Sequence, residues 1–177
     1  MSNKLSVDKK GKLCCGFLAD TRRGVLLGSA VGILLVAASY YYNLEYAYEN
    51  MRDPELNYSS DVLNEIDLIQ YIHTGVALLT CLGYLLGLLG TITFSPSYVQ
   101  LNSLISLVSN LGLTGVFVWL GVQYDPDFPY YTVIGPMLAL MFTLYANEGF
   151  IHEAKTGIMT PGSYASRERY CCCHICC

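Results

Sequence analysis

Seven of the eight cysteines of this 177-residue chain stand in two clusters near its ends. Thiols clustered beside a bilayer suit reversible S-acylation, in which a thioester joins a fatty acyl chain to the protein. Each buried methylene of such a chain contributes about 0.8 kcal/mol, so several chains would hold both tails at the membrane. The sequence therefore predicts lipidation at Cys14, Cys15, Cys171, Cys172, Cys173, Cys176 and Cys177.

Two other chemistries remain open for the C-terminal cluster. The final pair Cys176-Cys177 formally matches a double-prenylation signal, although His174 shows that the end is not a C-a-a-X box. A metal site would draw on Cys173, His174 and Cys176, the only C-x₂-C spacing in the cluster. Adjacent cysteines do not easily chelate one tetrahedral ion, so we predict no metal and no other cofactor.

The rest of the chain offers little reactive chemistry. It has no nucleophile-base pattern, no phosphate-binding loop and no basic nucleic-acid patch, so we predict neither an enzyme nor a nucleic-acid partner. The segment Asn57-Tyr58-Ser59 is the only glycosylation sequon, and Asn57 is the predicted glycan site.

The elements that must position these residues can be recognised from long runs without charged side chains. From Leu68 to Tyr124 the chain runs 57 residues without one Asp, Glu, Lys or Arg, whereas a soluble surface needs charges. The run is long enough for two membrane crossings of about 20 residues each. We therefore predict an all-α fold, a four-helix transmembrane bundle within 24–147, with spans at about 24–44, 68–93, 99–123 and 130–147.

One alternative concerns the first of these spans. Residues 25–38 also resemble the apolar region of a signal peptide, with Ala37-Ala38-Ser39 as a cleavage site. The apolar run continues to Leu44, which favours an uncleaved anchor.

Charge asymmetry sets the expected orientation. The tail 1–23 has six basic and two acidic residues, whereas the loop 45–67 has one basic and seven acidic residues. Basic flanks stay on the cytoplasmic side, so both termini are predicted to be cytoplasmic and the acidic loop to face outward. The cysteine-rich segment 148–177 is then a second cytoplasmic tail.

Small and polar residues recur at helical spacing inside the spans. Glycines at four-residue intervals allow close helix packing, within one bundle or between copies, at Gly24, Gly28, Gly32, Gly83 and Gly87. A polar stripe on the third span is expected to face other helices, either as interhelical hydrogen bonds or as a conduit that uses His73 of the second span. Its members are Asn102, Ser103, Ser106, Ser109 and Asn110.

A short N-terminal resemblance adds to this interpretation. Lys12-Leu13-Cys14-Cys15-Gly16, followed by Asp20-Thr21-Arg22-Arg23-Gly24-Val25 and a first span, resembles the lysosome-associated four-span transmembrane proteins. The proline-tyrosine motifs of that family's C-terminal tail are absent here.

The expected function is therefore a scaffold or trafficking protein of endomembranes or the plasma membrane. Its partners would be the lipid bilayer and other membrane proteins, including further copies of itself. The alternative is a small channel or transporter subunit that uses the polar stripe.

Overall fold

The structure is a computed structural model that describes residues 21–53, 58–123, 131–157 and 159–162. Four long helices dominate it: α1 (Thr21–Tyr42), α3 (Ser60–Ile92), α4 (Pro96–Gln123) and α5 (Tyr131–Lys155). A π-helical segment η2 (Asn43–Tyr48) and a short helix α2 (Glu49–Met51) continue α1. The described residues contain no strand, which confirms the predicted all-α bundle.

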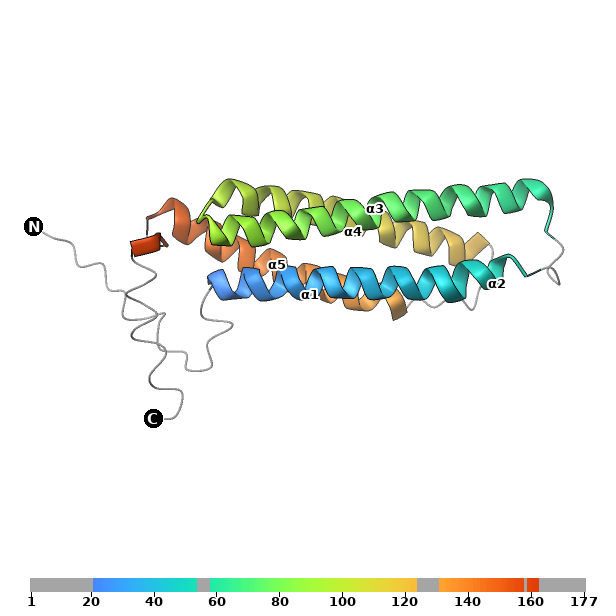
Figure 1. Ribbon diagram of the computed structural model, residues 1–177, viewed down its shortest axis with the longest axis horizontal. Helices are drawn as coiled ribbons and strands as arrows, with labels where there is room; N and C mark the ends of the chain where they lie inside the picture. The colour runs from blue at the N-terminus through green and yellow to red at the C-terminus, as the bar shows by residue number, and fades with distance from the viewer. Residues whose placement is uncertain (1–20, 54–57, 124–130, 158, 163–177) are drawn as a thin grey trace, which may run out of the picture.

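The four long helices lie side by side in an up-and-down ring (Figure 1). In this ring α1 packs on α3 and α5, and α4 packs on the same two helices from the other side. The beginning of α1, the α3–α4 turn and the end of α5 meet at one end of the bundle (Figure 1). We refer to it as the turn end, and to the opposite end, where α2 and the start of α3 lie, as the cap end.

Within the described residues, four helical stretches are long and apolar enough to cross a membrane: Thr21–Glu45, which runs from α1 into η2, Ser60–Ile92, Pro96–Trp119 and Ile134–Lys155. Large apolar side chains cover the outside of the bundle, as in Leu34, Leu78 and Leu104, which are all more than half exposed. Such an exterior is suited to lipid rather than to water.

Helix occupies much of the acidic segment 45–67 that the sequence predicts as a loop. The helix α3 begins at Ser60, eight residues before the predicted span, because the Ser59 side chain caps it by accepting from the Val62 amide. Its charged first turns still bury one face, since Ile66 and Ile69 pack against Tyr48, Met51, Leu113 and Phe117. Asp61, Glu65 and Asp67 therefore lie on a helix that begins before the predicted apolar span.

The α3–α4 turn is tight and anchored. Phe94 has a positive φ of 55°, and the Ser95 amide donates to the Gly90 carbonyl at 2.8 Å, closing the end of α3. The Arg22 guanidinium lies 4.6 Å from the centre of the Phe94 ring, and its Nε donates to the Thr91 carbonyl at 3.0 Å. Arg22 therefore fastens α1 to the turn.

The last helix, α5, runs through Pro136 and continues beyond the predicted span to Lys155. It is tied to α1 by a hydrogen bond of 3.0 Å from the Thr21 hydroxyl to Glu153. Beyond it, Gly157 takes a left-handed φ of 73° and the chain turns back, so that Met159 is buried beside Val25, Val99 and Phe150.

Candidate functional site

His73 is the centre of a buried cluster at the cap end of the bundle. It lies on α3, is 2% exposed, and its Nδ1 is 3.1 Å from the Tyr48 hydroxyl. The rings of Tyr40 and Phe117 meet the imidazole edge to face, with centres 5.1 and 4.9 Å away. Burial raises the pKa of the Tyr48 phenol, so near neutral pH its hydroxyl keeps its proton and forms this hydrogen bond in the neutral state. His73 therefore fastens η2 to α3.

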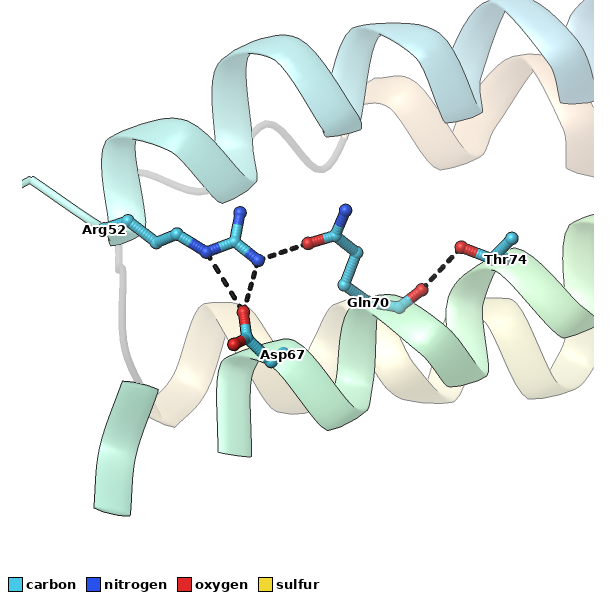
Figure 2. A network of polar contacts seen from close by, with 4 residues as sticks. All are labelled: Arg52, Asp67, Gln70 and Thr74. Atoms are coloured by element: carbon cyan, nitrogen blue, oxygen red, sulfur yellow. Dashed lines mark hydrogen bonds and ion pairs between the residues drawn. The ribbon is translucent and has the colours of Figure 1, made fainter. Parts of the chain in front are cut away.

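A more exposed network continues from this cluster (Figure 2). The Arg52 guanidinium contacts both the Asp67 carboxylate, at 2.5 Å, and the Gln70 side chain. The Thr74 hydroxyl donates to the Gln70 carbonyl at 2.8 Å and also bonds the Tyr40 hydroxyl. These contacts join α1, α2 and α3 where they leave the apolar layer. Sequence reasoning missed the network, because its contacts between elements join residues that are 15 to 34 positions apart along the chain.

The polar stripe of α4 lies inside the bundle. Asn102, Ser106, Ser109 and Asn110 are all buried, and Ser103 is half-buried. Most of their hydrogen bonds stay within α4, such as Asn110 Nδ2 to the Ser106 carbonyl at 2.7 Å and Ser109 to the Ile105 carbonyl at 2.7 Å. One bond crosses to α5, from Asn147 Nδ2 to Ser103 Oγ at 2.8 Å.

Several buried polar atoms near this stripe lack a hydrogen-bond partner within the described chain. They include Ser29 Oγ of α1, Asn102 Nδ2 of α4, and Thr143 Oγ1 and Asn147 Oδ1 of α5. All four residues are fully buried. A buried polar atom without a hydrogen-bond partner lowers the stability of a fold by roughly 1–3 kcal/mol. Among the described residues, most of the buried side-chain atoms without a partner lie in this layer.

The predicted packing glycines lie at helix contacts inside the bundle. A Cβ on Gly32 would lie 2.5 to 2.7 Å from the Tyr84 ring, and one on Gly28 would lie 2.7 Å from Thr143 Oγ1. A Cβ on Gly83 would meet Ile105 at 2.9 Å, and one on Gly87 would overlap Asn102 and Ser29. Gly24 is also buried. These glycines bring α1 and α3 against neighbouring helices of the same chain.

Two cavities matter for function. One of about 10 Å³ lies beside His73 and is also lined by Ser39, Asn110 and Thr114, which leaves room for about one water molecule. The other is a groove of about 300 Å³ on the outside, between α1 and α5. Its α1 wall is formed by Leu27, Val31 and Leu35, and its α5 wall includes Gly135, Leu138 and Phe142.

Some predicted site residues lie outside the described part of the chain. They are Asn57, His174 and the predicted lipidation cysteines Cys14, Cys15, Cys171, Cys172, Cys173, Cys176 and Cys177. The remaining cysteine, Cys81, is half-buried on α3. No group of three or more His, Cys, Asp or Glu side chains gathers within the described ranges in a way that could hold a metal ion.

No protein-family profile, curated protein or solved structure matches the chain. Its class therefore rests on its own sequence and geometry. Four apolar helices of membrane-crossing length, joined into one ring with an apolar exterior, define an integral multi-pass membrane protein.

Proposed function

We propose that this protein is a non-enzymatic scaffold or trafficking protein of endomembranes or the plasma membrane. It organises partner membrane proteins through its outer helix faces and is held by acylated cytoplasmic tails. The resemblance of residues 12–25 to the lysosome-associated four-span proteins places the lysosome among the candidate compartments, beside the Golgi, vesicles and the plasma membrane. Both tails would lie at the turn end, where Thr21 and Glu153 meet.

The observation that supports this proposal most is the closed interior. Close contacts at Gly28, Gly32 and Gly87 leave no room for a further side-chain atom between the helices at these positions, and the cavity beside His73 has room for about one water molecule. A solute would need a wider path than this. The surfaces left for interaction are the apolar outer faces and the two tails.

The proposal is tested by changing all five C-terminal cysteines to Ser in a tagged chain. We expect loss of the acyl-exchange mass shift that this tail produces, together with movement of the protein to another compartment. The matched control is Cys81→Ser, which removes a thiol on α3 and should change neither acylation nor location. Unchanged location after loss of acylation would contradict the proposal.

A channel or transporter subunit is the second candidate. One observation favours it, namely the unpartnered polar atoms of Ser29, Asn102, Thr143 and Asn147, contributed by three of the four long helices. If the helices separated at this layer, these groups would line a polar path. Solute flux through the purified protein in liposomes distinguishes the two candidates.

A further inference from the structure

The groove between α1 and α5 is a gap in an otherwise close-packed ring. Every residue that lines it is apolar or glycine, so it offers no hydrogen bond to a polar ligand. It is wide because one wall carries Gly135, at which a Cβ would meet only Leu35, at 3.7 Å. The groove volume of about 300 Å³ suits a flexible hydrocarbon chain.

The position of the groove along the bundle limits which hydrocarbon chains can reach it. Leu27, at its near end, is six residues into α1, which is about 9 Å from the turn end at 1.5 Å per residue. Leu35, at its far end, is a further eight residues, or about 12 Å, along the helix. The near end of the groove therefore lies closer to the end at which α1 begins than its far end does.

The chain itself carries predicted acylation sites close to that end of α1. Cys15 precedes Thr21 by only six residues, a segment that can reach at most about 20 Å. A fatty acyl chain on Cys15 would thus start within reach of the groove that α1 lines. The C-terminal cysteines lie farther in sequence from either wall, since Cys171 follows Lys155, the last residue of α5, by 16 residues.

We propose that the α1–α5 groove binds the acyl chain carried by Cys15 or its neighbour Cys14. The covalent lipid then fills the gap in the ring and fixes the N-terminal tail against the bundle. This inference rests on the acylation invoked in the proposed function, but it assigns the lipid a place within the fold.

Photo-crosslinking in cells tests this assignment. The full-length protein is labelled with a palmitate analogue that carries a diazirine on its chain, irradiated, and mapped by mass spectrometry. We expect cross-links on Val31 or Leu35 of the groove, whereas Leu34, which faces outward on α1 at 69% exposure, reports the background contact with labelled bilayer lipid. The double change Cys14→Ser and Cys15→Ser should abolish the groove cross-links.

Two variants that fill the groove extend the test. Gly135→Leu occupies it from the α5 side, and Val31→Phe occupies it from the α1 side. Both should keep the label on Cys14 or Cys15 and lose the groove cross-links. Having one variant on each wall protects the test against a single substitution that disturbs folding.

Each remaining outcome contradicts the inference in a recognisable way. Groove cross-links that persist in the Cys14/Cys15 variant would show that a bilayer lipid occupies the site, and cross-links between two chains would show a second copy. Label on the C-terminal cysteines alone would overturn the inference but leave the proposed function standing. Absence of label from every cysteine would overturn both.

Discussion

Gly32→Ala is expected to lower the free energy of unfolding of the bundle by roughly 1–3 kcal/mol, the usual cost of overpacking a filled interior. The new Cβ would lie 2.5 Å from Cζ of Tyr84 and 2.7 Å from both Cε atoms. The Tyr84 side chain is fully buried on α3, so its ring cannot turn into lipid without separating the two helices. Unfolding in detergent by increasing fractions of sodium dodecyl sulfate measures the loss.

Gly112→Ala is the matched control for this substitution. Gly112 also lies in a long helix, but nothing in the described chain comes within 4 Å of the position that its Cβ would take. Because alanine favours helix over glycine by about 1 kcal/mol, this variant should be as stable as wild type or slightly more so. If both variants lost the same stability, the close contact between Gly32 and Tyr84 would not exist in the membrane.

His73→Ala is expected to lower the free energy of unfolding by about 3 kcal/mol, because it creates a cavity and leaves a buried polar group without its partner. It leaves a void between the Tyr40 and Phe117 rings, and it removes the partner of the Tyr48 hydroxyl. We also expect the cap end to loosen first, because η2 and α2 are held to α3 partly through this contact. Amide hydrogen exchange of residues 43–51 would report that loosening as faster exchange.

Tyr71→Ala separates this effect from a general loss of aromatic volume. Tyr71 is on the same helix two residues away, but it is 74% exposed on the lipid-facing side. It should change stability by less than about 0.5 kcal/mol, as surface substitutions usually do. Equal losses for His73→Ala and Tyr71→Ala would rule out a special role for the buried imidazole.

Much of the fold could be predicted because membrane burial imposes a simple rule on sequence. A helix that crosses the bilayer needs a long run without charge, and each of the four long helices contains such a run. The four-residue glycine spacing likewise gave the close-approach positions, since only glycine allows Tyr84 to lie against Gly32. Both signals are local in sequence, so no tertiary information was needed.

The cap end could not be predicted for the same reason. Asp61, Glu65 and Asp67 marked the segment as a solvated loop, whereas the apolar face of the helix there is carried by Ile66 and by Ile69, two residues after Asp67. The partner of His73 is Tyr48, 25 residues away on an element that no periodic pattern indicates. The α1–α5 groove depends on how two helices cross, which composition does not encode.

We propose that the bundle is closed to solutes and that the protein acts through its outer faces and tails. Solute flux tests it most directly, with purified protein reconstituted into liposomes and ion leak and osmotic swelling recorded against protein-free liposomes. Asn102→Leu, which removes a polar group from the buried layer, is measured in parallel. The account predicts that neither protein raises flux above the protein-free level, whereas flux through wild type that Asn102→Leu abolishes would contradict it.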